Sequence, residues 1–100
     1  MLEIEPGTVI ALSPGIVLHS LPDQGWYHAF SVENGDQYNL NRTSFWVLEK
    51  ISNGIEWEQL IEDFINNFEV SLEEGQADLS ELVKELHNQN IIGRWENGKS

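Results

Sequence analysis

Three histidines are the side chains best suited to bind a metal ion or to transfer a proton near neutral pH. His19 and His28 lie on predicted strands, and His87 lies late on a predicted helix. Metal sites usually pair histidines at short spacings or combine them with cysteines, and this chain has no cysteine. The spacing favours separate surface or half-buried imidazoles, so we expect no metal and no cofactor.

Seventeen aspartate and glutamate residues could supply a general acid and a general base. Most of them fall opposite the apolar positions of the predicted helices, which is typical of a solvated acidic face. Asp78 is the exception, because it adjoins Leu79 on an apolar stripe and could bond to the strand region. The chain has no Ser-His-Asp order, glycine-rich phosphate loop or nucleotide fingerprint. These patterns predict a protein that is not an enzyme.

The charge of the chain argues against nucleic acid and anionic lipid as partners. Seventeen acidic and five basic residues give a formal net charge of -12, and the resulting field repels phosphate groups. The basic residues are also scattered along the chain instead of lying on one helix. Four tryptophans could stack on bases, but basic residues do not interleave with them, so anchoring in a core or an interface is the stronger interpretation.

Three strand-like segments precede the helices and are expected to form a sheet. They span residues 16–21, 26–32 and 37–41, and the last places Tyr38 and Leu40 between polar neighbours. The Asn34-Gly35 pair supplies the positive φ of a tight hairpin, so the second and third segments should be antiparallel neighbours. One face of residues 26–32 carries larger side chains than the other, and we expect that face to point into the core. Its members are Trp26, His28, Phe30 and Val32.

Three helices are expected to follow the sheet. Asn41 suits the N-cap of the first helix, and Gly54 suits the left-handed position after its last turn. The second helix has apolar residues at three- and four-residue spacings within residues 57–68. Residues 71–74 have the form of a capping box and begin the third helix, which Asn90 ends in a left-handed conformation. The apolar stripe of this third helix consists of Leu72, Leu79, Leu82, Val83 and Leu86.

One hundred residues with 40% hydrophobic content are enough for a single domain with one core. We expect this domain to span residues 15–93, between an N-terminal extension of residues 1–14 and a C-terminal tail of residues 94–100. The extension contains a strand-like run at residues 8–12. No apolar run approaches the length of a membrane span, and the first residues lack the pattern of a signal peptide. A cytoplasmic protein is therefore expected.

The predicted arrangement suits the binding of an extended peptide. A small sheet with one open edge would lie beside an apolar helical stripe. The backbone of a bound peptide would extend the sheet, and its side chains would enter pockets. Because enzymes and nucleic-acid binders are disfavoured above, the residues favour a peptide-binding module.

The order and spacing of these segments are similar to those of the PqqD family. The similarity covers roughly residues 15–93 and rests on a strand, a Leu-Asn pair, a helix, an Asn-Gly pair, a second helix, and an aspartate followed by leucines. This family comprises small peptide chaperones, also called RiPP recognition elements, which bind the leader of a ribosomally made precursor peptide. The similar segments are Gly15-Ile16-Val17, Trp26-Tyr27-His28-Ala29-Phe30, Tyr38-Asn39-Leu40-Asn41, Trp46-Val47-Leu48, Asn53-Gly54, Leu60-Ile61, Phe68, Asp78, Leu82-Val83, Leu86 and Ile91.

The resemblance implies an α+β, winged-helix-like fold in which a three-stranded antiparallel sheet is followed by three helices. It also implies that the leader pairs antiparallel with the third strand and lies in the groove between that strand and the third helix. On this chain the pairing edge would be Gln37, Tyr38, Asn39, Leu40 and Asn41. The groove wall would draw on Asp78, Leu79, Leu82, Val83 and Leu86, several of which must serve the core instead.

The function implied by the resemblance is that of a non-catalytic adaptor that presents the leader to a separate modifying enzyme. In the pyrroloquinoline quinone pathway that enzyme is a radical SAM protein, and in lasso-peptide pathways it is a leader peptidase; the sequence favours neither. A winged-helix DNA-binding regulator is the alternative, but its recognition helix needs basic residues and the predicted third helix has only Lys84. A structural subunit that oligomerises through its aromatic residues is a third possibility.

Overall fold

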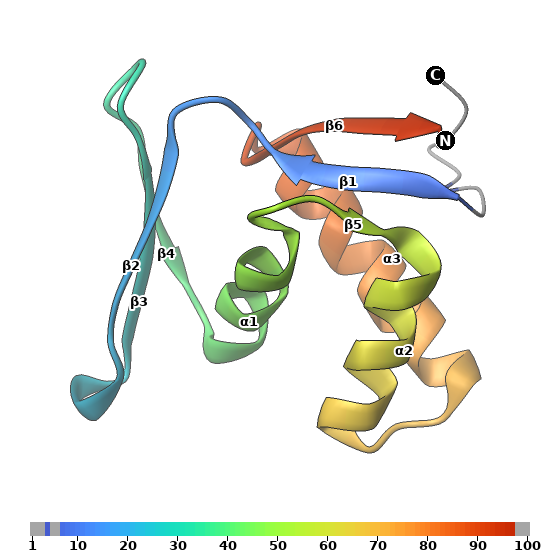
Figure 1. The fold of residues 1–100 in the computed structure, drawn as a ribbon. Helices are drawn as coiled ribbons and strands as arrows, with labels where there is room; N and C mark the ends of the chain where they lie inside the picture. Colours follow the sequence, from blue (N-terminus) through green and yellow to red (C-terminus); the bar gives the residue numbers. More distant parts are fainter. Residues whose placement is uncertain (1–3, 5–6, 98–100) are drawn as a thin grey trace.

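The computed structural model describes Ile4 and residues 7–97, and it confirms the predicted α+β class (Figure 1). The first half contains β1 (Thr8–Leu12), β2 (Ile16–Leu21), a 3-10 turn at Pro22–Gln24, β3 (Trp26–Ser31) and β4 (Gln37–Leu40). The second half contains α1 (Arg42–Ile51), β5 (Ile55–Glu56), α2 (Trp57–Phe68), α3 (Leu72–Asn88) and β6 (Ile92–Asn97). Within this described part, no helix combines the length and the apolar character that a membrane span requires.

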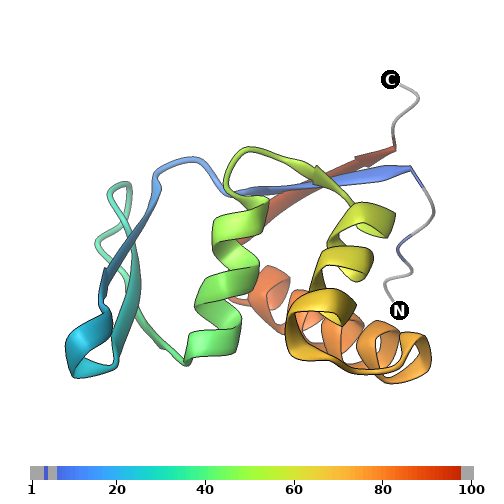
Figure 2. The same cartoon turned by 60° about the horizontal axis from the view of Figure 1, so that its bottom comes forward.

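Strands β2, β3 and β4 form the antiparallel meander that the sequence predicted. Ala29 in the central strand lies opposite Leu18 of β2 and Tyr38 of β4. The hairpin between β3 and β4 turns at Gly35, whose φ of 80° is accessible to glycine at little cost. The backbone N–H of Gly35 donates to the carbonyl of Ser31 (2.8 Å). In Figure 1 and Figure 2 the meander stands on one side of α1, and α2 and α3 lie on the other.

The meander turns its smaller side chains toward the core, which is the opposite of the prediction. Ala29 and Ser31 are buried, and the Tyr27 ring packs on Phe45 of α1 with centroids 5.2 Å apart. Alternation along β3 places the larger set on the outer face. This set is Trp26, His28, Phe30 and Val32. The prediction was wrong because small residues let the helical layer approach the sheet closely, while the larger rings pack against one another outside.

A second antiparallel sheet, in the order β5-β1-β6, lies across one end of the helices (Figure 2). Val9 of β1 is opposite Glu56 of β5 and Glu96 of β6, and Ile10 is completely buried in the core. Strand β1 falls in the segment predicted as an N-terminal extension, and most of β6 falls in the predicted C-terminal tail. The boundaries predicted near residues 14 and 93 therefore lie inside one continuous fold.

The predicted helix ends are confirmed. Asn41 Oδ1 accepts a hydrogen bond from the backbone N–H three residues later (2.7 Å), and Ser71 Oγ accepts the equivalent bond at the start of α3 (3.1 Å). Gly54 and Asn90 adopt left-handed conformations, with φ of 82° and 65°. Caps satisfy amides that a helix leaves unpaired. The ends of α1 and α3 therefore follow from local sequence.

The core lies where the three helices meet the two sheets. Its buried members are Ile10, Val47, Leu48, Ile51, Trp57, Leu60, Ile61, Phe64, Leu79, Val83, Leu86, Ile91 and Ile92. Leu72, predicted as part of the apolar stripe of α3, is instead 58% exposed. It is the first residue of α3 and precedes the close contact with α2, where a Cβ on Gly75 would lie 2.8 Å from Ile65 Cγ1. The stripe therefore becomes buried only after the first turn.

Candidate functional site

Strand β4 lies at the edge of the meander. In the described part of the chain it pairs with β3 on one side, and no strand pairs with its other side. An unpaired strand edge presents a row of backbone N–H and C=O groups that another extended chain can bind. The predicted pairing edge, Gln37 to Asn41, consists of this strand and the N-cap of α1.

The hydrogen bonds of the ladder show which groups of β4 face outward. The backbone N–H of Ser31 donates to the carbonyl of Asp36 (2.9 Å), one position before β4 begins. Hydrogen-bonded positions alternate along an antiparallel pair, so the backbone groups of Tyr38 and Leu40 face β3. Those of Gln37 and Asn39 face away from the sheet. The sequence alone could not show which alternate residues of β4 have outward-facing backbone groups.

The Tyr38 side chain ties β4 to the end of α3. Tyr38 Oη donates to the backbone carbonyl of Gln89 (3.2 Å), which caps the C-terminus of α3. Tyr38 and Leu40 are half-buried and pack against the core, whereas the side chains of Gln37 and Asn39 are exposed. An added strand would therefore meet outward backbone groups on β4 and two partly accessible apolar side chains beside them.

The five residues that were predicted on α3 divide into two groups. Leu79, Val83 and Leu86 are buried in the core, with exposed fractions of 0%, 0% and 2%. Leu82 is half-buried at the margin of the core, and Asp78 is exposed. The bond from Asp78 to the strand region that the sequence suggested is not present among the described residues. Of these five side chains, only Asp78 and Leu82 are accessible to a ligand.

A hollow of about 320 Å³ lies where the hairpin end of the meander meets the β1–β2 connection and the turn after α3. Tyr38 of the meander and Asn90 of the turn line it, and Glu33 contributes a carboxylate. Sequence reasoning identified Asn90 only as a helix stop, and it missed the Gln89 carbonyl that holds Tyr38. A backbone acceptor leaves no mark in the sequence, so no signal could have revealed that contact.

The outer face of the meander carries a cluster of aromatic rings. The Trp26 ring meets His19 edge-on and His28 at a tilt, with ring centroids 5.4 Å and 4.8 Å away. Both ring nitrogens of His28 are buried without a hydrogen-bond partner in the described structure. Among the described residues, no group of three or more His, Asp or Glu side chains is arranged to hold a metal ion. His19 and His28 thus pack on this face of the meander, whereas His87 lies in the last turn of α3.

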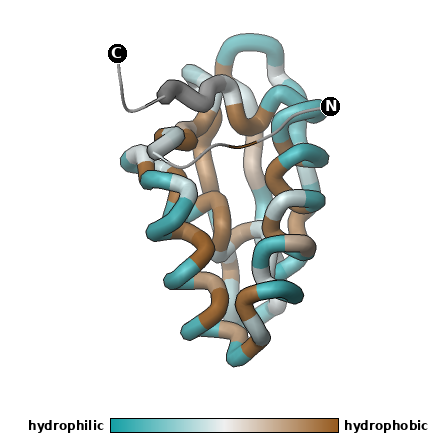
Figure 3. The backbone as a smooth tube through the Cα atoms, turned by 90° about the vertical axis from the view of Figure 1, so that its right-hand side faces the viewer, coloured by the Kyte–Doolittle hydropathy of each residue, from teal (hydrophilic) through white to brown (hydrophobic). Residues whose placement is uncertain are grey.

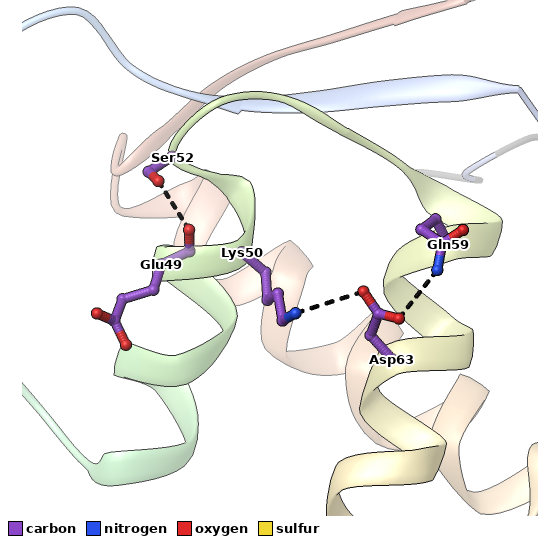
Figure 4. Close-up of polar contacts among 5 residues, drawn as sticks. All are labelled: Glu49, Lys50, Ser52, Gln59 and Asp63. Atoms are coloured by element: carbon purple, nitrogen blue, oxygen red, sulfur yellow. Dashed lines mark hydrogen bonds and ion pairs between the residues drawn. The ribbon is translucent and has the colours of Figure 1, made fainter.

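A polar contact joins α1 to α2 on the surface (Figure 4). Lys50 Nζ lies 3.5 Å from Asp63 Oδ2, and Gln59 Nε2 donates to the other oxygen of the same carboxylate (2.9 Å). Lys50 also lies over the Trp46 ring, 5.4 Å from its centroid. One of the few basic residues is therefore already engaged within the protein.

Comparison with known proteins supplies two findings. The sequence matches the family model described as coenzyme PQQ synthesis protein D (PqqD) over residues 28–92. The fold is similar to the solved structure of TbiB1 in complex with the TbiA(beta) leader peptide, with a TM-score of 0.73 and 13% sequence identity. This similarity covers 86% of the present chain and 98% of the TbiB1 chain. A comparison with curated proteins gives no match.

Proposed function

This chain belongs to the PqqD family, and we propose that it is a non-catalytic adaptor for a ribosomally synthesised precursor peptide. In this proposal the chain binds the leader of the precursor by strand addition to β4 and presents it to a separate modifying enzyme. The observation that carries the proposal is the unpaired edge of β4, on which the backbone groups of Gln37 and Asn39 face outward.

The shared fold supports a leader peptide as the ligand. TbiB1 has this fold, and its structure was solved with a leader peptide. We infer the same class of ligand here. The leader would run antiparallel to β4 and lie toward α3, with Tyr38 and Leu40 on one side and Asp78 and Leu82 on the other. Buried residues of α3 would support this wall without touching the peptide.

Backbone pairing alone is too weak to explain a tight complex. Gln37 and Asn39 together expose two donors and two acceptors, and each net hydrogen bond contributes about 0.5–1.5 kcal/mol, or about 2–6 kcal/mol in all. A micromolar complex needs about 8 kcal/mol. Apolar contacts with Tyr38, Leu40 and Leu82 would have to supply the remainder, and these side chains would also select among leaders.

The modifying enzyme in this proposal is either a radical SAM protein, as in a pyrroloquinoline quinone-type pathway, or a leader peptidase, as in a lasso-type pathway. The adaptor would work in the cytoplasm, because the precursor is made on ribosomes there. The enzyme, and not the adaptor, would carry out the covalent modification of the precursor. The adaptor mixed with precursor alone should leave the mass of the peptide unchanged, and a mass shift without the enzyme would contradict this part of the proposal.

Proline substitutions test the site directly. Labelled candidate leaders, taken from short reading frames that neighbour this gene, would be titrated with the protein in fluorescence anisotropy. Asn39→Pro removes an outward N–H and crowds the added strand, so leader affinity should fall by more than about 1 kcal/mol, or about fivefold, while the domain stays folded. Tyr38→Pro removes an N–H that serves the native ladder, so it should lower the free energy of unfolding instead.

The matched control is Asn39→Ser, which alters an exposed side chain and keeps the backbone donor. It should bind the leader almost as well as the unmodified chain. If a folded Asn39→Pro variant also binds normally, the peptide does not dock on β4 and the proposed site is wrong. Tight binding to random duplex DNA, with a steep dependence on salt, would instead favour the regulator.

A further inference from the structure

A pocket remote from the β4 edge lies between α2 and the first turns of α3. Its volume is about 250 Å³, and Ile61, Ile65 and Leu72 supply its apolar lining. Leu72 is 58% exposed, although it begins a helix whose later apolar residues face the core. Its aliphatic side chain adds exposed apolar surface to the lining of the pocket. We call this feature the α2–α3 pocket.

Carboxylates border the apolar lining. Glu58 and Glu62 both line the pocket, are exposed, and lie one turn apart on α2. Like charges at this spacing repel each other. Glu58 Oε1 accepts a hydrogen bond from the backbone N–H of Gly7 (2.7 Å), whereas Glu62 has no partner in the described part of the chain. Among the described residues, none that lines the pocket is basic, so a cation brought in by a partner would relieve this repulsion.

We propose that the α2–α3 pocket docks a basic amphipathic helix of the modifying enzyme. One apolar side chain of that helix would fill the space beside Ile61, Ile65 and Leu72. Lysine or arginine residues one turn apart would pair with Glu58 and Glu62, whose spacing matches a helical repeat. This inference rests on the proposed adaptor function, and it assigns the enzyme-facing surface that such an adaptor needs.

Charge argues against a second copy of this chain as the occupant of the pocket, and position argues against the leader peptide. A second copy of this chain carries the same formal charge of -12, and its approach would oppose carboxylates to carboxylates. A leader on β4 would lie elsewhere. In both ribbon views α1 stands between the meander and α2, and the α3 residues proposed to meet the leader, Asp78 and Leu82, do not line the pocket. Figure 3 views α2 and α3 from the side away from the meander, with hydrophobic and hydrophilic positions alternating along both helices. The two surfaces can therefore be occupied together.

Two synthetic helical peptides provide the test. Both carry leucines at i, i+4 and i+7; one has lysines beside them, and the other has glutamates. The basic peptide should bind and shift the amide NMR signals of Ile61, Leu72 and Gln76, and its affinity should fall several-fold between about 50 mM and about 300 mM salt. Leu72→Ser should weaken binding about fivefold, and Glu62→Lys should weaken it about tenfold and improve binding of the acidic peptide.

Matched controls separate the pocket from general properties of the surface. Val32→Ser alters an aliphatic side chain that is 64% exposed on the meander, and Glu81→Lys makes the same charge change on α3 outside the pocket lining. Both should leave affinity for the basic peptide unchanged. Equal loss from Glu81→Lys and Glu62→Lys, or equal binding of both peptides, would overturn the proposal, because net charge alone would then explain the result.

The remaining outcomes concern the other occupants. Self-association in sedimentation that Leu72→Ser abolishes would assign the pocket to a second copy and overturn the proposal. Competition between a bound leader and the basic peptide would likewise overturn it, because the pocket would then belong to the leader site. The peptide assay needs no leader, so a failure of leader binding would refute the adaptor function while leaving the result at the pocket interpretable.

Discussion

The β4 edge and the α2–α3 pocket present different chemistry to a partner. The edge offers backbone groups at Gln37 and Asn39, and any extended peptide can pair with such groups. The pocket offers the side chains of Leu72 and Glu62, which select for shape and charge. Recognition at the edge should therefore tolerate side-chain changes and resist salt, whereas recognition at the pocket should depend on both. In the proposed complex, specificity for a leader would come from the apolar residues that flank the edge.

Truncating a side chain in the core that supports both surfaces should cause the largest loss of stability and of binding. Leu79 is completely buried, so Leu79→Ala should lower the free energy of unfolding by about 2–5 kcal/mol, and binding at both surfaces should fall as the folded fraction falls. Leu72→Ala removes the same atoms from an exposed position of the same helix and should change stability by less than about 1 kcal/mol. Urea titration of both variants measures the difference. A similar loss from both would show that Leu72 is a core residue and not part of a docking surface.

Substitutions at the two helix caps should cause an intermediate loss of stability, and each should weaken binding at one surface only. Asn41→Ala and Ser71→Ala each remove a side-chain acceptor for an amide in the first helical turn, and each should lower stability by about 1 kcal/mol. Asn41 directly follows β4 as the N-cap of α1, so its substitution should weaken leader binding and leave binding of the basic peptide unchanged. Ser71 precedes Leu72, so its loss should do the reverse. Melting curves with both binding assays test this, and identical effects on the two ligands would show that the surfaces are not independent.

The smallest effect is expected at the surface contact between α1 and α2. Lys50 and Asp63 have side chains that are 41% and 28% exposed, and such ion pairs contribute about 0–1 kcal/mol. Lys50→Met should shift the melting temperature slightly at low salt and not at high salt, while both ligands bind as before. The measurement is a melting curve at two salt concentrations with anisotropy at each. A clear change in leader affinity would reveal coupling between the two surfaces through α1 and α2.

Features with a local cause could be predicted from the residues themselves. The positive φ of Gly35, the caps at Asn41 and Ser71 and the left-handed Asn90 each depend on chemistry within a few positions, and the structure confirms them. Asn34 does not adopt positive φ, so the connection is wider than the tight hairpin that was predicted. The class of fold follows, because hydrophobic periods of two and of about 3.6 distinguish strands from helices. Strand β4 belongs to the same group, since an alternating segment just before a helix cap can be recognised without its neighbours; its place at the edge of the sheet was implied only by the family resemblance.

Features that depend on contacts between residues far apart in the chain could not be predicted from the sequence. The pairing of β1 with β5 and β6 joins segments near the start, the middle and the end of the chain, and no local pattern identifies such a partner. The inner face of β3 was mistaken because burial there depends on how closely α1 approaches Ala29, not on side-chain size. The division of α3 into buried Leu79, Val83 and Leu86 and accessible Asp78 and Leu82 likewise depends on where the other helices and sheets pack against it.

Short-range chemistry was thus sufficient to identify the strand-like segments of β1 to β4, the three helices and the caps of α1 and α3, because backbone geometry and capping act within a few residues; β5 and β6 were not identified. Packing decided which backbone groups of β4 face outward, how Tyr38 reaches the end of α3 and where α2 and α3 leave a pocket around Leu72. These properties arise when segments far apart in sequence meet, since burial and hydrogen-bond phase belong to pairs of elements and not to either one alone.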